Sequence, residues 1–283
     1  MWPLGRQPRA DVIRLIGVDI DGTLVDSTGH VPPANAAAIE DAVAAGIHVA
    51  LVTGRSYPWA RPVAVGLPDR LTLIVSNGAV ERAHDGTTLA RNLLPRALAQ
   101  QALEATRGSR ASAALIFDRD TSGQIVFESM DWDHPARRGY FERNRQFIAS
   151  APSLEGALTE DPVQVMFNGG VRDMRALADV LRGLDGCALS ITEYAEKDFT
   201  LLDLTSAEAT KGQALRRRAA ALGLQPHETM AVGDNFNDVE MLESVGTAVV
   251  MGNAVAALKE RGWHVTGHQD DAGLAQAIRR FAL

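Results

Sequence analysis

"VIRLIGVDIDGTLVDS", residues 12–27, joins an apolar run of strand length to two aspartates one residue apart and a turn at Gly22. The run predicts a buried strand that ends at the acids. In an extended chain Asp19 and Asp21 point to the same side, with Ile20 turned the other way into packing. Two carboxylates this close repel each other unless a cation or a transferring group lies between them. The stretch therefore indicates a charged site at the carboxyl end of a buried strand.

Strand-like runs and helical patterns alternate on both sides of this stretch. The runs at 47–53, 71–79, 229–234 and 247–251 alternate with helical patterns such as 33–46 and 211–223. Such alternation implies parallel strands joined by right-handed crossovers, with helices on both faces of the sheet. We therefore predict an α/β fold with a Rossmann-like, doubly wound parallel sheet in its core.

The middle of the chain has a different pattern. Residues 84–205 contain hairpin-like pieces with turn signals at Asp85-Gly86 and Ser122-Gly123, mixed with two or three helices. We interpret 84–205 as an α+β cap domain inserted into a discontinuous core made of 11–83 and 206–283. A chain of 283 residues is long enough for two such domains.

Composition argues against several classes of partner. The net charge is −7, and "LRRRAA" at 215–220 is a short run more typical of a solvated helix face than of a nucleic-acid site. No window approaches the roughly 18 apolar residues that a membrane span requires. The single cysteine, Cys187, excludes an intrachain disulfide and fits a reducing compartment. We expect a cytoplasmic protein without nucleic-acid or membrane partners, and its oligomeric state stays open.

Polar side chains gather where the predicted strands end. Asp19 and Asp21 follow the first strand, Thr53 and Gly54 end the second, and Asp234 ends the strand at 229–234. Ligands of open parallel sheets bind beyond the carboxyl ends of the strands. An oxygen-rich site of this kind suits Mg²⁺, whereas a zinc site would need a cluster of cysteine and histidine that the sequence lacks.

Four short stretches carry a resemblance to a known family. They are "DIDGTL" at 19–24, "LVTGR" at 51–55, "TKG" at 210–212 and "GDNFND" at 233–238. In this order they resemble the four signature motifs of the haloacid dehalogenase superfamily. Because the insertion falls between the second and the third motif, the chain is similar to the Cof-like sugar-phosphatase branch, whose cap selects the substrate.

The resemblance implies a role for each acid. Asp19 would be the nucleophile that attacks phosphorus, and also a metal ligand. Asp21 would be the general acid for the leaving alkoxide and then the base for the hydrolytic water, with its backbone carbonyl facing the metal. Asp234 would be the third protein ligand to Mg²⁺.

It implies phosphate contacts as well. Thr53 and the amide of Gly54 would hold the transferring phosphoryl oxygens. Lys211 would bind the phosphoryl group and neutralise charge in the transition state. Asn237 would donate a hydrogen bond to the phosphate, and Asp238 would hold Lys211 or a metal-bound water.

The sequence thus predicts a Mg²⁺-dependent phosphatase that hydrolyses a small phosphorylated metabolite, a sugar phosphate or similar monoester, through an aspartyl-phosphate intermediate. Two alternatives stay open, namely phosphoryl transfer to an acceptor other than water, as in phosphomutases, and a catalytically silent phosphate-binding protein. Arg55 is interpreted as mostly structural, and Asn77 either forms a turn or approaches the site. Polar and aromatic cap residues such as Trp132 and Tyr194 are expected to form an ordinary surface, so the cap shows no readable specificity code.

Overall fold

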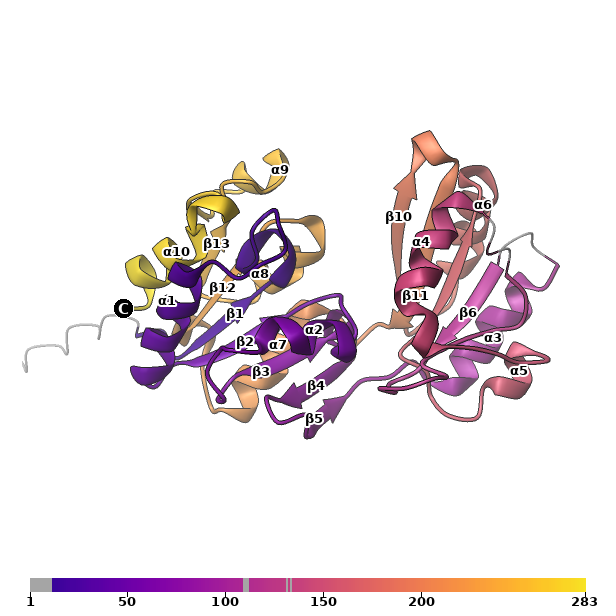
Figure 1. The fold of residues 1–283 in the computed structure, drawn as a ribbon, viewed down its shortest axis with the longest axis horizontal. Helices are drawn as coiled ribbons and strands as arrows, with labels where there is room; N and C mark the ends of the chain where they lie inside the picture. Colours follow the sequence, from indigo (N-terminus) through magenta and orange to yellow (C-terminus); the bar gives the residue numbers. More distant parts are fainter. Residues whose placement is uncertain (1–11, 109–111, 131, 133) are drawn as a thin grey trace, which may run out of the picture. The chain divides into compact units, whose positions relative to one another are not determined.

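The computed structural model describes residues 12–108, 112–130, 132 and 134–283 (Figure 1). Residue 11, where the sequence predicts the core to begin, lies outside them. The described chain divides into two compact units. We call residues 12–90 and 210–283 the core unit, and 91–209 the cap unit.

The core unit contains an eight-stranded sheet in the order β14-β13-β12-β1-β2-β3-β4-β5. From β14 to β3 every neighbouring pair is parallel, and β4 is antiparallel to β3. This arrangement confirms the predicted α/β fold with a doubly wound parallel sheet. The strands are β1 Leu15–Val18, β2 His48–Val52, β3 Thr72–Val75, β4 Val80–Ala83, β5 Thr88–Arg91, β12 Thr229–Gly233, β13 Thr247–Val250 and β14 His264–Val265.

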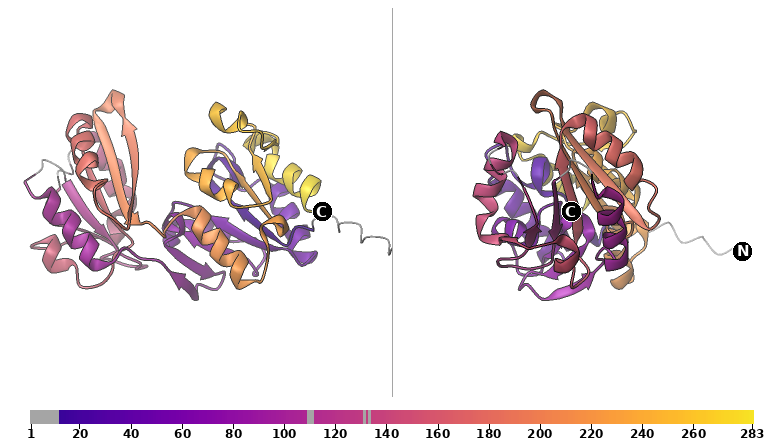
Figure 2. Two further views of the ribbon diagram at one scale, coloured as in Figure 1. Left: turned by 180° about the vertical axis from the view of Figure 1, so that it is seen from behind. Right: turned by 90° about the vertical axis from the view of Figure 1, so that its right-hand side faces the viewer.

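Helices cover both faces of this sheet. Every residue of β1 is therefore buried. On one face Leu15 packs in a cluster with Leu215 of α7 and Leu242 of α8. Ile16 and Val18 are equally buried on the other face, and α1 packs against α10. Figures 1 and 2 show α1 and α7 on opposite sides of the sheet. The helices are α1 Pro33–Ala44, α2 Tyr57–Ala64, α7 Lys211–Ala221, α8 Val239–Glu243, α9 Ala256–Lys259 and α10 Gly273–Phe281.

The boundary between the units follows a hairpin. β4 and β5 are joined by a turn in which Asp85 Oδ1 accepts a hydrogen bond from the Thr87 amide, at 2.8 Å, and Gly86 has φ +93°. Both strands extend the core sheet, so the core unit continues to residue 90 and resumes at 210. These limits differ from the predicted 84 and 205, because the hairpin at Asp85-Gly86, which the sequence analysis placed in the cap, belongs to the core sheet.

The cap unit is built on a six-stranded sheet in the order β10-β11-β9-β6-β7-β8. Its pairs are antiparallel except for β7 and β8, and β6 and β7 form a hairpin through the predicted turn at Gly123, where φ is +86°. The strands are β6 Ser112–Ile116, β7 Ile125–Phe127, β8 Ile148–Ser150, β9 Gln164–Gly169, β10 Cys187–Tyr194 and β11 Phe199–Ser206. The helices are α3 Arg96–Thr106, α4 Pro135–Asn144, α5 Leu154–Ala157 and α6 Val171–Leu181. None of the helices in the described part of the chain has the length and apolar character that crossing a bilayer requires.

Candidate active site

Three adjacent strands of the core sheet end at polar residues. β12, β1 and β2 are parallel neighbours, and the residues that follow them are Asp234, Asp19 and Thr53. Parallel strands present their carboxyl ends at the same edge of a sheet. The register of the sheet therefore brings these three residues to one edge, where the sequence predicts a polar site.

Lys211 connects the acids at the centre of the site. Its Nζ lies 2.6 Å from Asp19 Oδ1 and 2.7 Å from Asp238 Oδ1, and it donates a hydrogen bond to each. Asp19 is 4%, Lys211 2% and Asp238 0% exposed. The two carboxylates compensate the charge of the ammonium where water cannot reach it, but one ammonium does not neutralise both acids.

Asp238 also organises the loop that carries Asp234. Its Oδ2 accepts hydrogen bonds from the backbone amides of Asp234, at 2.9 Å, and Asn235, at 3.1 Å. A Cβ on Gly233 would lie 2.6 Å from the Asp238 side chain, so this loop closes only over a glycine. Both Asp238 oxygens are thus used in fixing Lys211 and the loop.

The turn after Asp19 explains the glycine of the opening stretch. Residues 20–24 form a tight turn in which Gly22 has φ +82°, and Asn253 Nδ2 donates to the Gly22 carbonyl at 2.8 Å. A Cβ on Gly22 would collide with the Asp234 carboxylate. Glycine is therefore required here for two reasons. The backbone is left-handed, and the Asp234 carboxylate lies too close to leave room for a Cβ.

Asp21 lies apart from the buried acids. β1 ends at Val18, so Asp21 lies beyond the strand, and its side chain is 61% exposed. Both of its oxygens accept from Arg55, with Nε 2.9 Å from Oδ2 and Nη2 2.5 Å from Oδ1. The sequence interpretation assigned no such partner to Asp21.

The segments after β2 and β3 interlock beside Asp19. Thr53 Oγ1 accepts from the Arg55 amide at 3.1 Å, and the Asn77 amide donates to the Thr53 carbonyl at 2.9 Å. Asn77 has φ 55°, and its buried side-chain Oδ1 has no hydrogen-bond partner among the described residues. A Cβ on Gly54 would lie 3.1 Å from that oxygen. Asn77 therefore forms the turn, and its side-chain oxygen also lies next to Gly54, so the two roles predicted for it do not exclude each other.

A sequence model of the family described as haloacid dehalogenase-like hydrolase matches residues 16–278, which is almost the whole chain. The chain is a haloacid dehalogenase-like hydrolase.

Several known proteins similar to this hydrolase are phosphatases. It is 28% identical to phosphatase YwpJ of Bacillus subtilis, over 95% of this chain and 100% of YwpJ. It is also 28% identical to pyridoxal phosphate phosphatase YbhA of Escherichia coli, over 94% of this chain and 97% of YbhA. The crystal structure of TM0651 from Thermotoga maritima matches with a TM-score of 0.80 at 20% identity, over 96% of this chain and 98% of that one, and supports the fold. The predicted superfamily and the phosphatase class of enzyme are confirmed.

Burial and charge set the protonation of the hydrolase's central groups. Burial, with the nearby charges of Asp238 and Asp234, raises the pKa of Asp19 above its ordinary value, although Lys211 opposes this rise. Burial alone lowers the pKa of an ammonium, but the carboxylates of Asp19 and Asp238 raise the pKa of Lys211 overall. Burial and the charge of Asp238 raise the pKa of Asp234 to about 6. The carboxylates of Asp19, Asp234 and Asp238 repel one another, and a further cation bound among them would reduce this repulsion.

The acids of this hydrolase fit a divalent cation. Carboxylate oxygens of Asp19, Asp234 and Asp238 lie within 4.8 Å of one another. Asp234 Oδ1 is buried and has no hydrogen-bond partner among the described residues, whereas Asp238 is already held by Lys211 and two amides. Asp19 and Asp234 are thus the acids available to a metal, and oxygen donors are the ligands that hard divalent cations prefer.

Asn237 is a predicted site residue that lies on an exposed loop. It is exposed on the loop after β12, beside Phe236, which is 63% exposed. Its contact with phosphate stays a prediction. In the same loop Asn235, which the sequence analysis did not single out, accepts from the Phe236 amide at 2.8 Å and begins the helical turn at 236–238.

Proposed function

We propose that this hydrolase is a Mg²⁺-dependent phosphatase that hydrolyses small phosphorylated metabolites, sugar phosphates or similar monoesters, through an aspartyl phosphate on Asp19. The observation that carries the proposal is the buried contact of Lys211 with Asp19 and Asp238. A protein that only binds phosphate gains nothing from a buried carboxylate at the position of an attacking nucleophile, since like charges repel. The ammonium of Lys211 beside Asp19 offsets part of this repulsion, as a carboxylate that attacks a phosphoryl group requires.

In the first half-reaction Asp19 bonds to phosphorus through one carboxylate oxygen, and the bond from phosphorus to the leaving oxygen breaks. Asp21 donates a proton to that leaving oxygen. Arg55 holds both Asp21 oxygens and so fixes the direction of this carboxylate beside the site.

In the second half-reaction water attacks the phosphorus of the aspartyl phosphate. Asp21, now a carboxylate, takes a proton from this water, and the bond from phosphorus to Asp19 breaks. Inorganic phosphate leaves, Asp19 is again a carboxylate, and the alcohol and phosphate together contain the atoms of one water and one monoester.

The remaining residues bind and orient the phosphoryl group. Lys211 compensates the negative charge that Asp19 and the phosphoryl oxygens share, and Asp238 keeps its ammonium in place. The Thr53 hydroxyl and the Gly54 amide are proposed to donate to phosphoryl oxygens, and Asn237 to donate from the loop after β12.

The proposed metal ligands are the Asp19 and Asp234 carboxylates and the Asp21 backbone carbonyl. Mg²⁺ held there would supply positive charge to the phosphoryl oxygens, so that a carboxylate can approach them. The buried, unpartnered Asp234 Oδ1 supports this assignment.

The size of the substrate is proposed from the relatives. YbhA is a pyridoxal phosphate phosphatase, and it aligns with 94% of this chain. We extend only its general class, a small phosphorylated metabolite, to this hydrolase. We also propose a cytoplasmic location, because a single cysteine is typical of proteins in a reducing compartment.

Phosphate release from 4-nitrophenyl phosphate tests the proposal. The wild type should release phosphate with Mg²⁺ and without an added acceptor, and EDTA should abolish the release. Asp19→Asn should lower turnover at least about 10³-fold, whereas Asp41→Asn, which changes an exposed acid on α1, should not. Undiminished turnover in Asp19→Asn contradicts the mechanism. Release of 4-nitrophenol that requires an added alcohol acceptor and yields a new phosphate ester instead of inorganic phosphate identifies a phosphotransferase, and no turnover of any phosphate ester identifies a binding protein.

A further inference from the structure

The loop after β13 connects two segments of the candidate active site. It spans residues 251–255, between β13 and α9, and belongs to the core unit. The amide of Val255 donates to the carbonyl of Asp234 at 3.1 Å, and the amide of Met251 donates to the carbonyl of Gly233 at 3.0 Å. The backbone of this loop therefore holds the segment that carries Asp234.

A side chain of the same loop holds the turn after Asp19. Asn253 Nδ2 donates to the Gly22 carbonyl at 2.8 Å and to Gln269 Oε1 at 3.2 Å. Asn253 Oδ1 accepts from the Gln269 backbone amide at 2.9 Å. A side-chain amide that is bonded through both its nitrogen and its oxygen has little freedom to rotate. Asn253 therefore fixes the direction of the Gly22 carbonyl.

The two segments that this loop holds also lie against each other. A Cβ on Gly22 would collide with the Asp234 carboxylate. Three contacts thus form a closed set, namely Asn253 with Gly22, Val255 with Asp234, and Gly22 against Asp234. The turn and the Asp234 segment cannot move apart without the loss of one of these hydrogen bonds.

The closed set of contacts lies next to two proposed metal ligands, the Asp21 carbonyl and the Asp234 carboxylate. The peptide unit that carries the Asp21 carbonyl is planar and ends at the α carbon of Gly22, so fixing Gly22 restricts the direction of that carbonyl. Residues that orient metal ligands without binding the metal typically change its affinity by about 10–100-fold. Asn253 is placed to act in this way.

We propose that Asn253 is a positioning residue that sets the distance between the Asp21 carbonyl and the Asp234 carboxylate, and through it the selectivity of the site for Mg²⁺. The inference rests on the metal site of the proposed function and goes beyond it, because Asn253 is not among the proposed ligands. Mg²⁺ requires near-ideal octahedral geometry at about 2.0–2.1 Å, whereas Ca²⁺ accepts irregular arrangements at about 2.3–2.6 Å. Loss of the Asn253 contact should therefore weaken Mg²⁺ binding more than Ca²⁺ binding.

Titration calorimetry of MgCl₂ and of CaCl₂ into the metal-free full chain tests the inference. Asn253→Ala should weaken Mg²⁺ binding about tenfold and Ca²⁺ binding less than about threefold. Asn253→Asp keeps an oxygen for the Gln269 amide but has no donor for the Gly22 carbonyl. Because its new carboxylate attracts both cations, the ratio of the two affinities is the informative quantity, and it should shift towards Ca²⁺ as in Asn253→Ala. This second variant keeps the test decisive where Asn253→Ala folds poorly.

Asn35 supplies a matched control on the same turn. Its Nδ2 donates to the Leu24 carbonyl at 3.0 Å, and its Oδ1 accepts from the Ala275 amide at 3.0 Å. It therefore holds residues 20–24 through an amide bridge of the same kind, but neither of these partners belongs to the loop 251–255. Asn35→Ala should lower the free energy of unfolding, as Asn253→Ala does, and leave the ratio of the two affinities unchanged.

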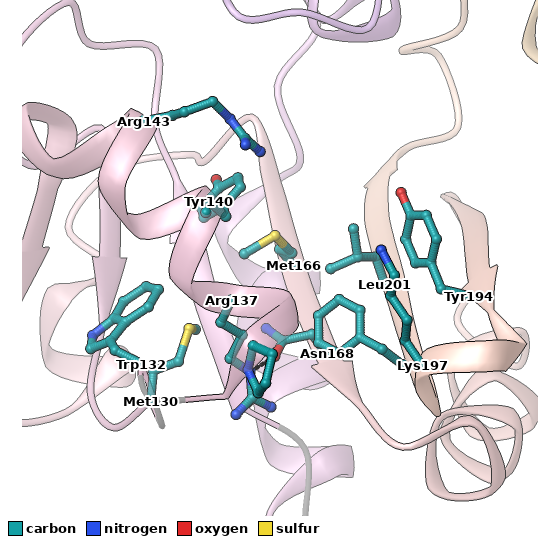
Figure 3. Close-up of a pocket in the computed structure, with 13 residues that line it drawn as sticks. Met130, Trp132, Arg137, Tyr140, Arg143, Met166, Asn168, Tyr194, Lys197 and Leu201 are labelled. Carbon is teal, nitrogen blue, oxygen red and sulfur yellow. Dashed lines mark hydrogen bonds between the residues drawn. The ribbon is translucent and has the colours of Figure 1, made fainter.

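Asn168 supplies a second control, in the cap unit. It is buried, and its Oδ1 accepts from Arg137 Nε at 2.6 Å in a pocket that both residues line (Figure 3). Asn168→Ala removes a buried amide of the same type from a unit that contains none of the proposed metal ligands. It should lower stability and leave the affinities for both cations unchanged.

The outcomes separate this inference from the proposed function. An equal affinity ratio in wild type and Asn253→Ala, or an equal shift in Asn35→Ala, overturns the inference, because Asn253 would then act on stability alone. Mg²⁺-dependent phosphate release together with an unshifted ratio leaves the phosphatase proposal intact. A chain that binds Mg²⁺ with the predicted variant pattern but hydrolyses no phosphate ester supports the inference and contradicts the proposed function. Absence of Mg²⁺ binding in the wild type overturns the inference and the metal-dependent mechanism together.

Discussion

Arg55 holds Asp21 by both carboxylate oxygens, across the edge of the sheet where β1 and β2 end. The pair is partly exposed, with the Arg55 side chain 28% and the Asp21 side chain 61% accessible, so its contribution to stability is small. Its effect is geometric, because a two-point contact fixes the direction of a carboxylate that would otherwise rotate in water.

We expect Arg55→Ala to lower kcat about tenfold, because Asp21 loses the contact that sets its position as proton donor. Arg55→Lys should recover only part of the loss, since an ammonium cannot replace two parallel hydrogen bonds. The decisive measurement is the leaving-group dependence. Loss of acid catalysis affects an alkyl phosphate more than 4-nitrophenyl phosphate, whose leaving group needs no proton. Equal losses on both substrates would show that Arg55 does not act through Asp21, and Arg61→Ala, an exposed arginine of α2, serves as the control.

We expect Lys211→Met to destabilise the fold by about 3–5 kcal/mol in EDTA, because it leaves two buried carboxylates without their cation. Turnover should fall about 10³-fold. Adding Asp238→Asn should restore part of the stability without restoring activity, since it removes one of the two uncompensated charges. Chemical denaturation measures the stability. An unchanged denaturation midpoint in Lys211→Met would contradict the electrostatic role that the structure gives this residue.

Gly22→Ala and Gly29→Ala form a matched pair. Both glycines have positive φ, +82° and +83°, so each alanine carries the same backbone penalty of about 1–2 kcal/mol. Only at Gly22 does the added Cβ meet the Asp234 carboxylate, whereas nothing lies within 4 Å at Gly29. We expect Gly22→Ala to lose more stability and to require more Mg²⁺ for half-maximal activity. Identical Mg²⁺ dependence in the two variants would place Asp234 outside the metal site.

The cap unit contains an acid whose burial opposes ionisation. Burial raises the pKa of Asp203 from 3.8 to about 6, and Gln164 Nε2 donates to its Oδ1 at 2.8 Å. Because the folded state holds this proton more tightly than the unfolded state, the contribution to stability is complete below about pH 4 and is lost as the pH rises to about 6. Asp203→Asn should therefore raise the free energy of unfolding at pH 7 by about 1–3 kcal/mol and leave it nearly unchanged at pH 4. Denaturation from pH 4 to 8 measures this difference, with Asp185→Asn, on the surface, as control. A gain of equal size at both pH values would point to a cause other than ionisation.

Sequence reading succeeded where a residue's position depends on its own strand or helix. Asp19 and Asp234 directly follow strands that hydrophobic runs indicate, and Lys211 begins a helix whose pattern is plain. Parallel neighbours then align those ends without further information. For that reason the sequence could predict that the acids and the lysine of the candidate site lie near one another.

Sequence reading missed the side-chain contacts that depend on backbone turns and on partners far away in the chain. The sequence did not indicate that Asp21 pairs with Arg55, which lies 34 residues away. In the cap, α4 is mostly polar, so its pattern did not reveal that Arg137 and Tyr140 line a pocket on the sheet. Such contacts require the three-dimensional arrangement, because neither partner is marked by its local sequence.

The discontinuous core has a consequence for synthesis on the ribosome. β1 lies between β2 and β12, yet β12 follows β1 by roughly two hundred residues, and the contact between Asp19 and Lys211 spans 192 positions. Until the returning segment emerges, the growing polypeptide exposes one edge of a strand that is fully buried in the folded protein, and other chains can add to such an edge. The cap unit, contiguous in sequence, has all its own strands available earlier, so it can fold before the domain into which it is inserted.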